Sequence, residues 1–135
     1  EWYWWYKFII NMRQLFLVFI GGGFGSVLRY IISRYLNNSE SNFPLGTFTA
    51  NILGSLLIGI IIGFAAKNNT LTQNQTLLLA TGFCGGFTTF STFAYENHVL
   101  FKSGDFTSFA LYTFASFIIA FLAVFAGIYL SRILS

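Results

Sequence analysis

The sequence is poor in charged residues and has a single cysteine. Charged side chains make up only 8% of the 135 residues, against roughly a quarter in ordinary soluble domains. A soluble protein of this length could not cover its surface with so few charges, so we conclude that lipid surrounds most of the chain. Because Cys84 is the only cysteine, an intrachain disulfide is excluded and the redox compartment stays undetermined.

The few charges are also scattered. The seven basic and four acidic residues form no run that could follow a nucleic-acid backbone, and we expect no nucleic-acid partner. Most lie near the ends of apolar segments, where interfacial anchors are found. The apolar segments show neither a nucleophile–base pair nor a metal-ligand cluster. We therefore expect a protein that is not an enzyme.

Residues 1–11 differ from the rest of the chain. They open with Glu1-Trp2-Tyr3-Trp4-Trp5-Tyr6-Lys7, whose aromatics flanked by charge suit an interfacial belt at the level of the lipid headgroups. A leader sequence ahead of a start at Met12 explains them equally well, and we assign them no function. We expect residues 12–135 to form a single four-helix transmembrane domain.

Four apolar segments are long enough to cross a hydrocarbon core of about 30 Å as helices. They are Gln14–Tyr35, Leu45–Ala66, Leu77–Ala94 and Phe106–Leu130, with polar turns between them. None has the polar face at helical spacing that a soluble bundle would need. The sequence therefore predicts an all-α membrane protein with four transmembrane helices per subunit.

Basic residues are nearly balanced between the two sides of such a bundle. Four spans place both termini on one side, with Lys7, Arg13, Lys67 and Arg132, and leave Arg34, Lys102 and Arg29 toward the other. The positive-inside rule then gives almost no preferred orientation. Such a balance is expected of a protein that inserts both ways round.

The third segment combines glycines with hydroxyl residues. It contains Gly82, Gly85, Gly86, Thr88, Thr89, Ser91 and Thr92. Glycine weakens a helix by roughly 1 kcal/mol relative to alanine, and unwound backbone survives in a membrane only when protein or water covers it. Broken helices of this kind mark ion sites in channels and transporters. We expect a break across Gly82–Phe93 that forms an ion site, with a plain glycine kink as the alternative.

Phenylalanines recur every third residue at Phe87, Phe90 and Phe93. Core packing explains such a stripe, but phenyl ring edges are electropositive and could also line a path for a desolvated anion. Other polar groups fall at membrane depth, where each needs a reason: Asn51, and the stripe Ser108, Tyr112 and Ser116. For Arg29, near the end of the first span, snorkelling to the interface, a part in anion passage and a structural bond all stay open.

Three stretches make the sequence recognisable. Gly85-Gly86-Phe87-Thr88-Thr89-Phe90-Ser91-Thr92-Phe93 closely resembles the third-helix signature of the Fluc (CrcB-type) fluoride channels. Residues 43–51 resemble the start of that family's second helix, and residues 21–30 its first helix. The resemblance implies a fluoride-selective channel that exports fluoride by passive permeation. It also implies an antiparallel, dual-topology homodimer with two pores in the bacterial inner membrane.

The resemblance further implies roles for individual residues. Phe90 and Phe93 would line the pores with their ring edges, and Asn51 would bond fluoride or orient the adjacent ring. The carbonyls of Gly85 and Thr88 from both subunits would hold one structural sodium ion at the dimer centre. The polar track would comprise Ser91, Thr92, Tyr112 and Ser116, and Arg29 would belong to the side where fluoride enters. Ala120, a turn beyond Ser116, has no hydroxyl where the track should continue.

A small four-span drug or cation exporter is the main rival. Proton-coupled export normally needs a carboxylate within the membrane. We expect Glu40, Glu96 and Asp105 to lie in or beside loops, and His98 in the loop beyond the third segment. A membrane enzyme or a structural subunit has no residue pattern in its favour.

Overall fold

The computed structural model describes residues 11–38, 40–67 and 70–134, which are helical or in short connections. The elements are α2 (Met12–Leu36), α3 (Leu45–Ala65), α4 (Gln73–Thr76), the π-helical η1 (Leu77–Cys84), α5 (Gly85–Phe87), α6 (Ser91–Ser103) and α7 (Phe106–Ile133). The interpretations of residues 1–10 lie outside the described residues.

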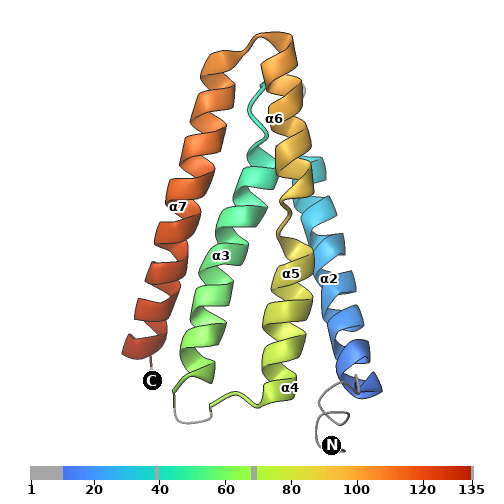
Figure 1. The fold of residues 1–135 in the computed structure, drawn as a ribbon, viewed down its shortest axis with the longest axis vertical. Coiled ribbons are helices and arrows are strands. Elements are labelled where there is room, and N and C mark those ends of the chain that lie inside the picture. Colours follow the sequence, from blue (N-terminus) through green and yellow to red (C-terminus); the bar gives the residue numbers. More distant parts are fainter. Residues whose placement is uncertain (1–10, 39, 68–69, 135) are drawn as a thin grey trace, which may run out of the picture.

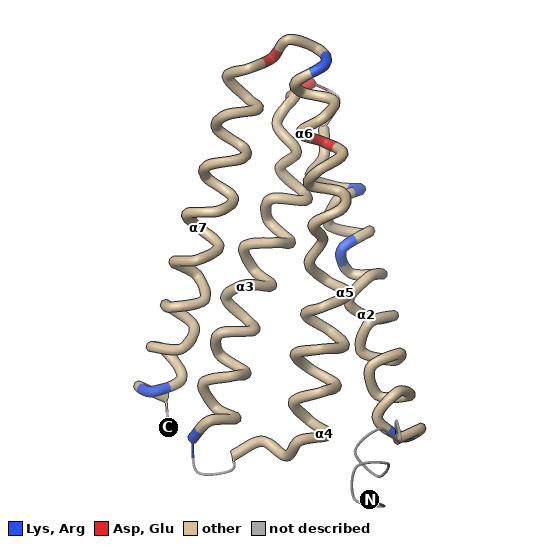
Figure 2. Tube along the Cα trace, viewed as in Figure 1, with Lys and Arg blue, Asp and Glu red and all other residues tan. Residues whose placement is uncertain are grey.

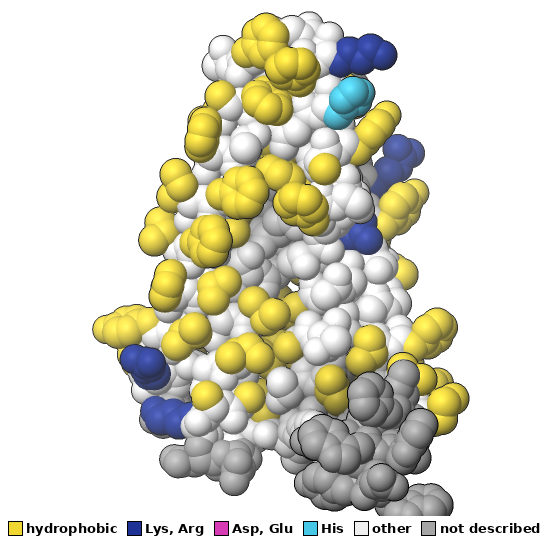
Figure 3. Space-filling view, viewed as in Figure 1, with side chains coloured by type: hydrophobic (Ala, Val, Ile, Leu, Met, Phe, Trp, Pro, Cys, Tyr) yellow, Lys and Arg dark blue, Asp and Glu magenta, His cyan; other side chains and the backbone are white. Residues whose placement is uncertain are grey.

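In the described part of the chain, four helical stretches are long and apolar enough to cross a membrane, which confirms the predicted four spans. They are α2, α3, α7 and the composite third segment from Gln73 to Ser103. Large apolar side chains such as Phe19, Phe24 and Phe125 are 77%, 69% and 69% exposed. Figure 3 shows hydrophobic side chains over much of the visible face. This is the surface of a chain whose solvent is lipid.

The helices pair in two sets (Figure 1). α7 lies along α3, and the third segment lies along α2. α2 begins and α7 ends at the same end of the bundle. Basic residues lie near both ends of the helices (Figure 2). Arg13 and Arg132 are in the first turn of α2 and the last turn of α7, Lys67 follows α3, and Arg34 and Lys102 are in the last turns of α2 and α6.

The third segment extends further than the sequence predicted. α6 continues past Ala94 to Ser103, so the expected loop positions of Glu96 and His98 are wrong. Apolar residues that follow them keep the helix packed, and Leu100 is buried. The helix ends where Gly104 adopts a left-handed conformation (φ 81°).

Asp105 starts the next helix. Its Oδ1 accepts from Ser108 N at 3.1 Å, and its Oδ2 accepts from Asn42 Nδ2 at 3.0 Å. The bonds from Ser108, and after them the bond from Asn42, hold the pKa of the Asp105 carboxyl below its usual range. Asp105 therefore ties the α6–α7 turn to the connection that precedes α3.

Glycines bring α2 and the third segment close together. A Cβ on Gly21 or Gly25 would overlap the backbone carbonyl of Leu78 or Phe83, and one on Gly86 would overlap that of Gly22. In lipid, no hydrophobic effect drives helices together, and small residues at their interface allow the backbones to pack closely. Packing within the chain therefore accounts for the glycines at these positions.

This packing corrects the predicted extent of the helix break. Residues 82–87 are helical, so the prediction of a break over all of Gly82–Phe93 is wrong there. Only Thr88, Thr89 and Phe90 lie between α5 and α6, and Thr88 has extended backbone angles (φ −87°, ψ 158°). Gly82 and Gly86 serve contact with α2 rather than unwinding, because their missing side chains leave room for that helix.

Candidate ion-conduction groove

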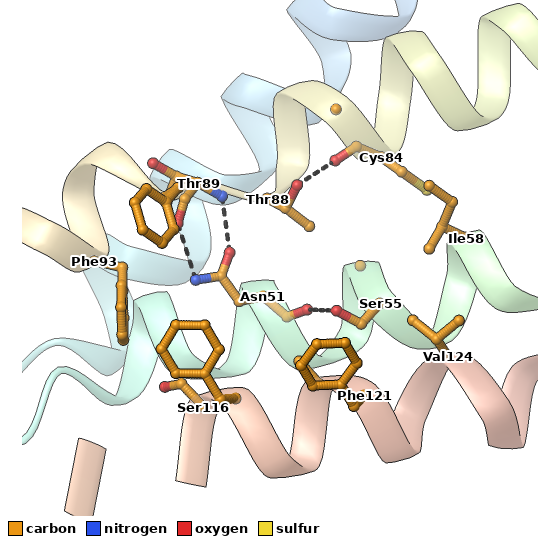
Figure 4. A pocket seen from close by; sticks show the side chains of 15 residues that line it. Asn51, Ser55, Ile58, Cys84, Thr88, Thr89, Phe93, Ser116, Phe121 and Val124 are labelled. Atoms are coloured by element: carbon orange, nitrogen blue, oxygen red, sulfur yellow. Dashed lines mark hydrogen bonds between the residues drawn. The ribbon is translucent and has the colours of Figure 1, made fainter. Parts of the chain in front are cut away.

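An open groove of about 390 Å³ runs between α3, the third segment and α7. Figure 4 shows side chains from all three directed into it. Its polar lining comprises Asn51, Ser55, Thr88, Thr89 and Ser116, and its aromatic lining comprises Phe90, Phe93, Phe117 and Phe121. The groove thus brings Asn51, Gly85, Thr88, Phe90, Phe93 and Ser116 together from separate parts of the chain.

Asn51 is bonded to the backbone between α5 and α6. Its Oδ1 accepts from Thr89 N at 2.8 Å, and its Nδ2 donates to Thr89 O at 3.1 Å (Figure 4). The amide therefore replaces two helical partners that Thr89 lacks at this point of the chain. One N–H of Nδ2 remains for a further acceptor. Because Phe90 follows Thr89 directly, Asn51 also fixes the backbone that carries the Phe90 ring.

Two carbonyls of this region lose the donors that a continuous helix would supply. Thr89 N would bond to the Gly85 carbonyl in an unbroken helix but bonds to Asn51 instead. Thr92 N would bond to the Thr88 carbonyl but donates to Thr89 Oγ1 at 3.2 Å. Gly85 is exposed on the single chain, and a Cβ there would come no nearer than 3.9 Å to Ala80 O.

The two groove phenylalanines differ in exposure. Phe90 is 71% exposed, whereas Phe93 is 8% exposed. Their ring centroids lie 5.7 Å apart. Phe93 also meets Tyr112 edge-on at 5.1 Å and Phe117 at 5.8 Å. The Phe93 ring is therefore fixed by neighbours, while the Phe90 ring lies at the surface of the chain.

The predicted stripe on α7 carries a buried polar cluster. Ser116 Oγ is buried and has no hydrogen-bond partner among the described residues. Tyr112 is fully buried, with its hydroxyl 3.5 Å from Glu96 Oε1. The Thr47 hydroxyl faces the same two groups, but it forms no hydrogen bond of good geometry with them. An unpaired buried hydroxyl is costly unless a ligand or water satisfies it.

The remaining predicted residues lie beside the groove. Arg29 Nε donates to the Gly86 carbonyl at 3.0 Å, so of its three explanations the structural bond is present. Ser26 Oγ approaches the same carbonyl at 3.4 Å. Ser91 is exposed, with its hydroxyl 3.5 Å from that of Thr89, and Thr92 is half-buried. None of these three predicted residues contributes to the groove lining.

Sequence reasoning missed several polar residues near the site. Thr47, Ser55, Asn97 and Thr113 were not predicted to take part, although Thr47 and Ser55 flank Asn51 at helical spacing. That spacing was the available signal for Thr47 and Ser55. Asn97 was missed because the third span was expected to end at Ala94.

The fold and groove define a four-span membrane protein with neutral hydrogen-bonding groups at membrane depth. Hydroxyls, an amide and ring edges can replace the water of a small ion without trapping it as a full charge would. The class is therefore that of a membrane protein with a path for a small ion.

Comparison with known proteins identifies the family. The profile of the family described as "CrcB-like protein, Camphor Resistance (CrcB)" matches residues 16–128. The chain belongs to this CrcB family, and the resemblance seen in the sequence is confirmed.

Curated relatives match over nearly their whole length. A protein of Gloeothece citriformis is 48% identical over 90% of this chain and 98% of its own. A protein of Azobacteroides pseudotrichonymphae is 44% identical over 90% and 98%, and one of Pyrococcus furiosus 40% identical over 91% and 99%. Each of the three is named "Fluoride-specific ion channel FluC". These names do not favour the rival interpretation of a drug or cation exporter.

Proposed function

We propose that this protein is a fluoride-selective channel through which fluoride crosses the membrane passively. Fluoride is small and tightly hydrated, so a path for it must offer several hydrogen-bond donors. The observation that carries the proposal is the buried, unpaired Ser116 hydroxyl at a groove that the Asn51 amide also lines. Both groups are neutral, which favours release as well as binding. The names of the relatives support fluoride as the permeant ion.

Phe90 and Phe93 supply the aromatic part of this path. A phenyl ring has an electropositive edge, which attracts an anion weakly and without a counter-charge. Both rings line the groove, and their centroids are 5.7 Å apart. An ion could therefore pass from one ring edge to the next. Ser116 would provide a hydroxyl within the groove. Tyr112, Ser91 and Thr92 lie outside its lining and would provide hydroxyls where the path continues beyond it, with Arg29 near the side where fluoride enters.

A homodimer accounts for the exposed parts of the groove. The groove is open on a single chain, and Phe90, its most exposed aromatic ring, has no cover. A second copy would enclose both and complete two pores. The balance of basic residues between the two ends supports an antiparallel pair of oppositely inserted subunits in the bilayer (Figure 2). The proposed location is the bacterial inner membrane, which follows from the family resemblance.

A structural sodium ion fits the backbone at the third segment. The Gly85 and Thr88 carbonyls have lost their helical donors, and carbonyl oxygens are suitable ligands for a hard cation. Gly85 is exposed on the single chain, and a Cβ there would make only an ordinary contact with Ala80 O at 3.9 Å, so a partner could approach its backbone. When bound, the ion would neutralise these carbonyls and join the two subunits.

Efflux from proteoliposomes loaded with fluoride tests the proposal. We expect fast release from wild-type vesicles and slower release with Ser116→Ala, which removes the unpaired hydroxyl. Thr107→Val, on the exposed face of α7, is the matched control and should release fluoride at the wild-type rate. The proposal fails if vesicles with the wild-type protein retain fluoride as well as vesicles without protein do.

Reporters fused to the C-terminus test the dual topology. Reporters that are active on opposite sides of the membrane should both give a signal. A signal from one side alone would remove the antiparallel arrangement.

A further inference from the structure

Two adjacent residues of α6 face two adjacent residues of α7. Thr113 Oγ1 donates to Asn97 Oδ1 at 3.0 Å. In the neighbouring pair, the Tyr112 hydroxyl lies 3.5 Å from Glu96 Oε1. Asn97 is 8% exposed, so its amide lies in the interior. A buried amide of this kind requires partners at both its ends.

The Asn97 amide has such partners. Its Nδ2 donates to the Phe93 carbonyl at 3.2 Å. A carbonyl can only accept, so the NH₂ group must face Phe93 and the oxygen must face Thr113. The Phe93 carbonyl therefore fixes the orientation of the amide, and the Thr113 hydroxyl donates to the amide oxygen that this orientation presents to α7. Together, the two bonds connect the backbone of Phe93 to α7.

This connection lies beside the contacts that hold the Phe93 ring. The ring packs edge-on against Tyr112 and Phe117 of α7, with centroids at 5.1 and 5.8 Å. A shift of α6 along α7 would change those contacts and turn a different part of the ring to the groove. Neither Asn97 nor Thr113 lines the groove, so any effect of theirs on it would pass through Phe93, which does line it.

We infer that Asn97 and Thr113 are positioning residues that hold the Phe93 ring edge in the conduction groove. The inference rests on the proposed fluoride conduction and adds residues that the proposed pore does not contain.

Isosteric replacement of Thr113 tests this inference. Thr113→Val keeps the shape of the side chain and leaves Asn97 Oδ1 buried without a donor. We expect fluoride efflux from proteoliposomes to slow about tenfold while the dimer still assembles. This is the effect of raising the conduction barrier by about 1.4 kcal/mol, which lies within the cost of one unpaired buried oxygen. Thr113→Ser restores the hydroxyl and should restore the rate. Thr107→Val, exposed on the same helix, should conduct as wild type.

A double-mutant cycle separates ring positioning from general loss of structure. In a Phe93→Ile background there is no ring edge to position, so Thr113→Val should slow efflux no further. If Thr113→Val does not assemble, Asn97→Leu takes its place. It removes both bonds of the Asn97 amide without leaving an unpaired amide.

Two outcomes overturn the inference. One is an unchanged efflux rate in Thr113→Val, and the other is an equal slowing with and without the Phe93 ring. A wild-type protein that releases no fluoride overturns the proposed function instead.

Discussion

Removal of the Asn51 amide should loosen the backbone between α5 and α6. Asn51→Leu keeps a similar volume but leaves Thr89 N–H and Thr89 O without their partners at 2.8 and 3.1 Å. An unsatisfied buried backbone group costs about 1–3 kcal/mol. Because Asn51 and Thr89 are half-buried, we take the lower part of that range for each group, about 2–3 kcal/mol in total.

Amide hydrogen exchange in detergent measures this effect at the residue concerned. If local opening limits exchange, a loss of about 2–3 kcal/mol accelerates exchange at Thr89 roughly 30- to 150-fold. Ser55→Ala is the matched control, because the Ser55 hydroxyl bonds only to Asn51 O in its own helix. We expect that variant to leave Thr89 exchange unchanged. If Thr89 exchanges at the same rate in Asn51→Leu as in the wild type, the Asn51 amide does not stabilise this backbone.

Further predictions concern packing, assembly, conduction and pH. Gly25→Ala should lower the melting temperature because its Cβ overlaps the third segment, whereas Gly23→Ala, with open space around it, should not. Gly85→Leu should abolish the dimer in size-exclusion chromatography while each chain stays folded, and a normal dimer would mean that Gly85 is not at the subunit contact. Phe90→Ile should slow fluoride efflux and keep the dimer, and normal conduction would reduce Phe90 to packing. The stabilising contribution of the Asp105 carboxylate, whose folded pKa is lowered, is present above its unfolded pKa. It is lost only as pH falls below roughly 4. The stability of Asp105→Asn should therefore depend less on pH in that range than the stability of the wild type does.

The four spans could be predicted because lipid imposes a simple rule. A helix that crosses a bilayer needs a long apolar stretch, and such stretches are visible in the composition alone. The predicted residues Asn51, Phe90, Phe93 and Ser116 also line one groove. Their roles in conduction stay predictions.

The extent of the break could not be predicted because glycine has two uses. The absence of a Cβ weakens a helix, and it also lets a helix approach its neighbour. Only the neighbour decides, and at Gly82 and Gly86 the neighbour is α2. The same limit applies to Thr89, whose backbone is held by Asn51 of another helix.

The polar contacts between α6 and α7 could not be predicted from the sequence either. Glu96 and Asn97 follow an apolar stretch and read as the start of a loop, but the apolar residues beyond them continue the helix. Their partners Tyr112 and Thr113 lie sixteen residues further along the chain. No local pattern links such pairs.

Ion selectivity in proteoliposomes tests the central claim most directly. Vesicles that hold the wild-type protein are loaded with equal concentrations of fluoride and chloride, and the release of each anion is followed with an ion-selective electrode. Neutral hydroxyl and amide donors in a narrow path should release fluoride and retain chloride, which is larger and accepts weaker hydrogen bonds. Fluoride release with chloride retained is the predicted result. Equal release of the two anions, or release of neither, would contradict the account.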